Sequence, residues 1–140
     1  MTSLIKISVT GAALPEDATD FVALLNPETK RMWTAHDLSF EGDEEFGHAE
    51  AENACAGLEL AGFKDWYCPS VEELFALADR SRHSPAADPL LNMKSGWYWS
   101  STSAAWSREF AWGVGFSLGE ANCDHRYHYA RVRAVRVASQ

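Results

Sequence analysis

Apolar and polar residues alternate along several short segments of this chain, a pattern that predicts β-strands with one buried face. In the first of them, Ile5, Ile7 and Val9 alternate with polar residues. Two more flank the turn-forming sequence Asn26-Pro27-Glu28-Thr29, which indicates a hairpin. The expected strands cover residues 4–9, 21–25, 30–34, 97–102, 110–116 and 132–137.

The middle of the chain carries the spacing of an amphipathic helix instead. In the segment 48–60, Ala51, Cys55 and Leu58 fall on one face, and Gly62 is expected to end this helix. Cys55 therefore points inward and is predicted to be an inert core thiol.

A second helix is predicted over residues 70–79, because Ser70 and Glu73 match a capping box at its start. Strands, two helices and further strands in this order indicate an α+β fold, with the helices packed on small, mostly antiparallel sheets. No linker divides the chain, so residues 1–140 are expected to form a single domain.

The segment 110–116 has one bulky face and one nearly bare face. Four large apolar residues alternate there with alanine and glycine, and a bare face commonly lets a ring or a backbone segment lie close. Core positions are predicted for Trp99 and Trp112, which fall on strand patterns. Exposure is predicted for Trp106, which stands in an expected loop.

The formal net charge of the 140 residues is −8, and it is unevenly distributed. Residues 1–80 contain 16 acidic and 5 basic residues, a net of −11, whereas residues 81–140 contain 4 acidic and 7 basic residues, a net of +3. An acidic surface repels phosphate groups, so direct binding of nucleic acid is not expected. The acidic segment 37–47 is interpreted as a solvated approach to the first helix, with a patch that imitates nucleic acid as the alternative.

The three cysteines, Cys55, Cys68 and Cys123, are odd in number and lack the CxxC spacing of metal sites. Free thiols in a reducing compartment are therefore expected, with a Cys55–Cys68 bridge as the alternative. Neither a secretory signal peptide nor a membrane-spanning segment is expected, because no apolar run is long enough.

Four motifs occur in the order and with the spacing of one known family. They resemble the TGLMW, DWRLP, YWSST and VRCVR motifs of the domain at the carboxy terminus of the Legionella collagen-like protein, over about residues 20–138. Tyr67, Cys68 and Ala134 depart from that pattern, which has Arg, Leu and Cys there. The four motifs here are Thr29-Lys30-Arg31-Met32-Trp33, Asp65-Trp66-Tyr67-Cys68-Pro69 within the segment 51–74, Tyr98-Trp99-Ser100-Ser101-Thr102, and Val132-Arg133-Ala134-Val135-Arg136.

This resemblance implies a C-type-lectin-like fold, related to that of formylglycine-generating enzymes, with two helices beside small sheets and the chain termini close together. It also implies adhesion or ligand binding, since some members bind sulfated glycans, although the net charge of −8 weakens that ligand class here. The matching motif residues are expected to be structural: Trp33, Asp65, Trp66, Pro69, Glu73, Trp99, Ser100, Arg133 and Arg136.

Candidate ligand-binding residues lie in two segments of the carboxy-terminal third, 103–109 and 120–129, both expected to be loops. Aromatic rings beside arginine suit sugar stacking or a protein hot spot, and amide, imidazole and carboxylate groups add adaptable hydrogen bonding. No second half of a zinc site accompanies the Cys123-Asp124-His125 sequence, so no metal site and no cofactor is predicted. The candidates are Trp106, Arg108, Asn122, Asp124, His125, Arg126, Tyr127 and His128.

The predicted function is a non-enzymatic ligand-binding module, similar to an adhesin or a receptor-binding domain, that recognises a protein or a glycan. The sequence contains no nucleophile elbow and no HExxH motif, so an enzyme is not expected. A phage or prophage origin and a location in the cytoplasm or in a phage particle are expected. The alternative is an intracellular acidic inhibitor or regulator that binds a basic partner, such as a nucleic-acid-processing complex, through its acidic amino-terminal half.

Overall fold

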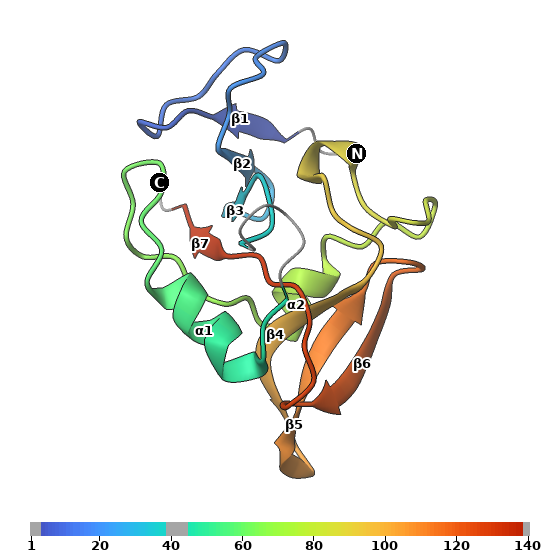
Figure 1. Ribbon diagram of the computed structural model, residues 1–140. Coiled ribbons are helices and arrows are strands. Elements are labelled where there is room, and N and C mark those ends of the chain that lie inside the picture. Colours follow the sequence, from blue (N-terminus) through green and yellow to red (C-terminus); the bar gives the residue numbers. More distant parts are fainter. Residues whose placement is uncertain (1–3, 39–44, 139–140) are drawn as a thin grey trace.

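The computed structural model describes residues 4–38 and 45–138, which form two antiparallel sheets and two short α-helices (Figure 1). The predicted α+β class is thereby confirmed. The first sheet has the order β1-β2-β3-β7, and the second has the order β4-β5-β6. Their strands are β1 (Ile5–Ile7), β2 (Ala23–Asn26), β3 (Arg31–Thr34), β7 (Val135–Val137), β4 (Trp97–Ala104), β5 (Ser107–Gly115) and β6 (Glu120–His125).

The predicted hairpin is formed by β2 and β3, with Leu24 opposite Trp33. The Asn26 side chain closes the turn, because its Oδ1 accepts hydrogen bonds from the N–H groups of Glu28 and Thr29 at 2.9 and 3.3 Å. The strands β1 and β7 share this sheet but lie at its opposite edges. The first and last strands therefore share one sheet, but β2 and β3 separate them, so the expectation of closely adjacent chain ends is met only in part.

Both helices are shorter than predicted. Helix α1 (His48–Ala56) ends at Gly57 instead of Gly62, since the chain then turns back and Leu60 pairs with Phe63. Helix α2 (Val71–Phe75) begins with the predicted capping box: Ser70 Oγ accepts from the Glu73 N–H at 3.1 Å. A short 3₁₀ helix, η2 (Pro89–Leu91), follows within the long loop.

Successive residues of the strands enter two separate cores. Leu24, Trp33 and Tyr98 lie in one core together with Leu74 of α2. Their chain neighbours Ala23, Met32 and Trp99 lie in the other core together with Cys55 of α1. Each helix thus packs into its own core, and the predicted core position of Trp99 is confirmed.

The bare face of β5 receives the ring of Trp97, as the sequence predicts. A Cβ atom added at Gly113 would lie 2.7 Å from Cε2 of Trp97 and 2.5 Å from the carbonyl oxygen of Tyr98. Only glycine leaves room for this approach, because real Cβ contacts are longer.

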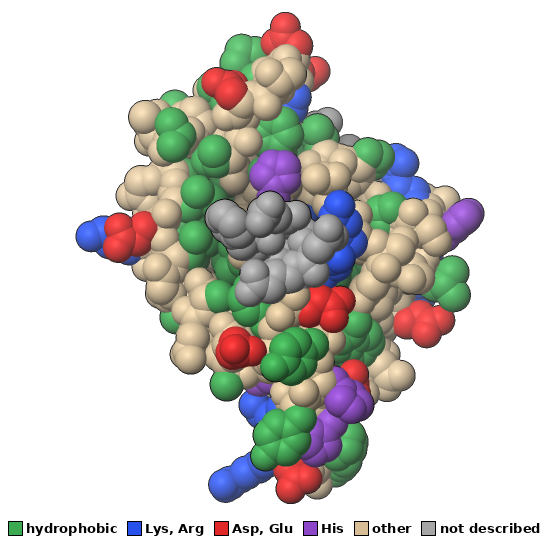
Figure 2. Space-filling model, viewed as in Figure 1, with side chains coloured by type: hydrophobic (Ala, Val, Ile, Leu, Met, Phe, Trp, Pro, Cys, Tyr) green, Lys and Arg blue, Asp and Glu red, His purple; other side chains and the backbone are tan. Residues whose placement is uncertain are grey.

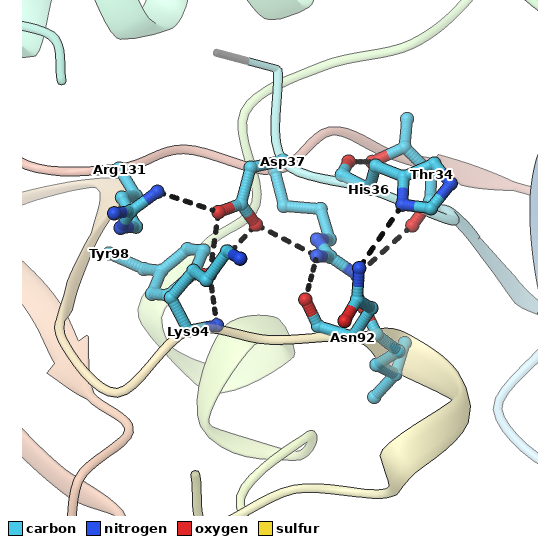
Figure 3. A network of polar contacts seen from close by, with 9 residues as sticks. Thr34, His36, Asp37, Asn92, Lys94, Tyr98 and Arg131 are labelled. Atoms are coloured by element: carbon cyan, nitrogen blue, oxygen red, sulfur yellow. Dashed lines mark hydrogen bonds and ion pairs between the residues drawn. The ribbon is translucent and has the colours of Figure 1, made fainter. Parts of the chain in front are cut away.

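A buried carboxylate, Asp37, accepts hydrogen bonds from three side chains (Figure 3). The Tyr98 hydroxyl donates to it at 2.7 Å, Arg133 at 2.8 Å and Arg131 at 3.3 Å. Burial and the adjacent carboxylate raise the pKa of the Tyr98 hydroxyl. The interpretation of 37–47 as a solvated segment is therefore wrong for Asp37, because two arginines and the Tyr98 hydroxyl take the place of water around its carboxylate. Residues 39–44 of that segment lie outside the described residues.

A second polar cluster lies at the turn before α2. Tyr67, which departs from the family motif, donates its hydroxyl to Glu73 Oε2 at 2.6 Å, and Arg31 Nε reaches the same oxygen at 2.7 Å. Burial and the Glu73 carboxylate raise the pKa of Tyr67 to about 12. Nearby, Arg136 pairs with Asp65 at 2.6 Å, consistent with the structural role expected of both.

The cysteines are free thiols, and the alternative Cys55–Cys68 bridge is not formed. Cys55 and Cys68 are both buried in the same core. Hydrogen bonding with Cys68, together with burial, raises the pKa of the Cys55 thiol. Cys55 is therefore protonated and unreactive at neutral pH, as the helix pattern predicts.

The segment 130–138 connects both sheets through its backbone. The N–H of Arg131 donates to the Trp97 carbonyl at 3.0 Å, in the second sheet. Further along, Val135 N–H donates to the Tyr67 carbonyl at 3.0 Å and Ala138 N–H to the Lys30 carbonyl at 2.9 Å. This one segment therefore holds the second sheet, the turn before α2 and the first sheet together.

Candidate functional site

The second sheet ends in a projecting hairpin that carries several of the candidate residues (Figure 1). The segments 103–109 and 120–129 are largely strand: β4 and β5 leave only Ala105 and Trp106 between them, and β6 covers Glu120–His125. The loop prediction is wrong there because an edge strand with polar residues on both faces lacks the alternation of a half-buried strand. Only residues 126–129 connect β6 to the following segment.

Four rings lie in a row, here called the aromatic strip: Trp106, His125 and Tyr127 from the two segments, and the adjoining Phe110 of β5. Successive ring centroids are 4.7, 5.2 and 4.8 Å apart. Trp106 exposes 66% and Tyr127 82% of its surface, so the predicted exposure of Trp106 is confirmed. Phe110 joins the strip because β5 and β6 place it directly opposite His125, a pairing that the sequence pattern does not reveal.

Charged side chains surround the aromatic strip, and Figure 2 shows histidine, apolar and charged side chains gathered at the lower end of the molecule. Glu109 Oε1 lies 3.6 Å from His125 Nε2, and Asp124 Oδ1 lies 2.7 Å from His128 Nδ1. Arg108 is exposed on β5. Such exposed pairs contribute little to stability, so a ligand can take their place. Across the part of the chain that the structure describes, no group of three or more side chains is arranged to hold a metal ion.

Asn122 and Asp124 cap the open edge of β6. The Arg126 N–H donates to the Glu109 carbonyl at 2.9 Å, and the alternation of an antiparallel ladder then turns the N–H groups of Cys123 and His125 outward. Those two N–H groups donate to the side-chain oxygens of Asn122 and Asp124, at 2.9 and 2.8 Å respectively. Amide groups that are capped in this way are not available to another strand, which protects the edge.

Removing the Asn122 and Asp124 side chains should allow the exposed edge of β6 to pair with another chain. We expect the Asn122→Ala/Asp124→Ala double variant to self-associate more strongly than the parent chain, because its outward N–H groups lack acceptors. Sedimentation velocity over a concentration series measures the change. The control Glu120→Ala alters the same strand without removing a cap and should sediment like the parent; a double variant that does the same would contradict the capping role.

Arg126 points back into the molecule. Its Nη1 donates to His48 Nδ1 at 2.8 Å, and its Nη2 donates to Ser103 Oγ at 2.5 Å. His48, the first residue of α1, is buried, and its Nε2–H donates to the Ser100 carbonyl at 2.8 Å. Burial lowers the pKa of His48, so the ring is neutral and can accept from arginine. The sequence pattern gives no signal for this contact, because the two residues lie 78 positions apart.

An apolar groove of about 320 Å³ lies on the same side of β5 as the aromatic strip. Trp112 lines it, two residues from Phe110 and therefore on the same strand face. Trp112 was expected in the core but is half-buried, because its ring lines this open groove beside Val71 and Phe75 of α2. The other lining residues are Val71, Glu72, Phe75, Thr102 and Ala121.

Residues 23–136 match the family model of the Lcl C-terminal domain, which covers most of the chain. The match includes the four sequence motifs and the eight candidate residues. No curated protein matches the chain. Within residues 4–38 and 45–138, no helix is long and apolar enough to cross a membrane.

Proposed function

Because this chain belongs to the Lcl C-terminal domain family, we propose that it is a non-enzymatic binding module with a C-type-lectin-like fold, whose ligand contacts the aromatic strip. The exposure of Trp106 and Tyr127 within a fixed row of rings is the observation that carries this proposal. Rigid aromatic side chains provide a large contact area and lose little conformational entropy when a ligand binds. A phage or prophage origin remains part of the proposal.

The proposed ligand is a protein or a glycan. A sugar ring or an apolar side chain can lie against the exposed face of Trp106, while polar groups of the ligand reach the surrounding carboxylates and imidazoles. Arg108, Glu109 and His128 supply donors and acceptors beside the strip. The apolar groove at Trp112 extends the same face, so an elongated ligand has a second place to bind.

Replacing the two exposed rings should remove binding without unfolding the chain. For Trp106→Ala/Tyr127→Ala we expect at least about a tenfold loss of affinity, with the free energy of unfolding changed by less than about 1 kcal/mol. A glycan array and a surface-protein panel, each probed with the purified chain with and without chelator, provide the measurement. The matched control is Val9→Ala, since Val9 is also 66% exposed but lies far from the strip in sequence and on the first sheet's side. Undiminished binding by the double variant would exclude the strip as the contact surface.

The second candidate function is an acidic regulator that binds a basic partner through the amino-terminal half. A groove of about 330 Å³, lined in part by Glu28 and Asp79 of that half, favours it. However, Asp37, Asp65 and Glu73 pair with arginines of the same chain, which reduces the charge left for a partner. Binding of this kind would weaken steeply with added salt and would not respond to changes in the aromatic strip.

A further inference from the structure

The loop 126–129, which carries Tyr127 of the aromatic strip, is fastened to α1 by a buried contact. The guanidinium of Arg126 reaches His48 and Ser103, and the His48 N–H donates to the Arg126 carbonyl at 3.3 Å. Only 1% of the His48 surface is exposed. The described contacts between the loop and the helix thus meet at one residue, His48, through its imidazole and its backbone N–H.

This connection requires a neutral imidazole. Nε2 of His48 carries the hydrogen that is donated to the Ser100 carbonyl, so Nδ1 must offer a lone pair to Arg126. A proton on Nδ1 would remove that lone pair and set an imidazolium against a guanidinium across 2.8 Å. The alternative partner is close: Glu52 Oε1 lies 3.6 Å from the same Nδ1, one helical turn further along α1.

We propose that His48, Arg126 and Glu52 form an acid-sensitive latch on the loop 126–129. When Nδ1 of His48 takes up a proton, it loses its hydrogen bond with Arg126 and pairs with Glu52 instead. The loop is then free, and Tyr127 leaves the aromatic strip. The consequence for binding rests on the proposed function, because the strip is the proposed contact surface. Acidification then weakens ligand binding while the two sheets stay folded.

The surroundings of the latch favour local opening. Arg126 Nε is buried and has no hydrogen-bond partner among the described residues, so release lets water reach a donor that is unsatisfied in the closed state. On the remaining sides His48 meets the Trp99 ring, at 5.1 Å between centroids, and the Ser100 carbonyl, neither of which titrates near neutral pH. The Glu50 carboxylate, also on α1, accepts a hydrogen bond from the Gly47 N–H.

The direction of the pH effect follows from burial, which lowers the pKa of His48, and the nearby guanidinium acts in the same sense. Because the pKa in the folded state lies below that in the unfolded chain, the latch contributes its full stability above about pH 6.5. That contribution is lost as the pH falls further. The latch is therefore closed at neutral pH and opens as the pH falls below about 6.5.

Amide hydrogen exchange followed by NMR tests the latch without any ligand. Between about pH 7.5 and about pH 5, after correction for intrinsic rates, we expect protection of the His48 and His128 amides to fall about tenfold, while β5 amides such as that of Val114 stay protected. Ring ¹⁵N shifts should show the Nε2–H form of His48 at the higher pH. Equal protection at both pH values, or a loss that extends to β5, would overturn the proposal.

Two sets of variants identify the responsible histidine. His125→Gln/His128→Gln removes the exposed imidazoles near the loop and should leave the pH effect intact, whereas His48→Gln should abolish it. Glu52→Gln keeps the buried ring, so it remains informative if the His48 variant fails to fold, and it should move the opening to lower pH. An opening pH that Glu52→Gln leaves unchanged would contradict the exchange of partners. Failure of these tests leaves the proposed binding surface untouched, because none of them measures binding.

Discussion

Replacing Asp37 with asparagine should lower the free energy of unfolding by about 3–5 kcal/mol. The carboxylate is 3% exposed and lies 2.8 Å from Nη2 of Arg133, whose side chain is fully buried. Without Asp37, the Arg133 charge remains in a poorly solvated interior with only carbonyl groups to receive its hydrogen bonds. Urea unfolding followed by tryptophan fluorescence measures the change.

The control for this variant is Asp79→Asn. Asp79 pairs with Arg82 at 3.1 Å near the surface, so its loss should leave the free energy of unfolding nearly unchanged. A further test is the double variant Asp37→Asn/Arg133→Met, which should lose less stability than the sum of the two single variants, because each removes the partner of the other. Strict additivity, or a loss for Asp37→Asn no larger than that for Asp79→Asn, would show that the buried pair is not coupled.

The variant Gly113→Ala should destabilise the fold by about 3 kcal/mol. The added methyl group would lie 2.5 Å from the Tyr98 carbonyl and 2.7 Å from the Trp97 ring, and the carbonyl belongs to a paired strand that cannot move away freely. The Trp97 ring must leave its place, so its fluorescence spectrum should also shift. Thermal and urea unfolding measure the stability.

Gly96→Ala is the matched control for Gly113→Ala. A Cβ atom added at Gly96 would meet nothing within 4 Å, so the free energy of unfolding should change by no more than about 0.5 kcal/mol. Equal effects at the two glycines would mean that general backbone entropy, and not the approach of Trp97, explains the glycine at 113.

The parts of the fold that the sequence predicts correctly depend on local patterns. The hairpin over 21–34, the capping box at Ser70 and the bare face of β5 each involve residues a few positions apart. The end of α1 is missed because Leu58 continues the apolar spacing of the helix, although it packs against the core from the segment that follows the helix. Apolar spacing predicts which residues are buried, but residues in a turn can be buried as well as residues in a helix.

The candidate site shows the same limit more strongly. Residue types alone identify Trp106 and Tyr127 as ring surfaces, and both are exposed. Their arrangement depends on the pairing of β5 with β6. This pairing places Phe110 beside His125 and places Asn122 at the edge of the sheet. The sequence thus predicts which side chains can contact a ligand, whereas contacts between residues distant in sequence can be identified only from the structure.

The segment 130–138 also determines when the protein can fold. It supplies the backbone contacts that join the two sheets, and β7 completes the first sheet beside β3. A nascent chain whose residues 130–138 are still inside the ribosome has both helices and the second sheet available but lacks the backbone hydrogen bonds through which this segment joins them to the first sheet. Its aromatic side chains would stay accessible to chaperones until that segment emerges. Folding of this chain should therefore follow the synthesis of the segment 130–138, and the many contacts between distant residues should make it slow for the size of the protein.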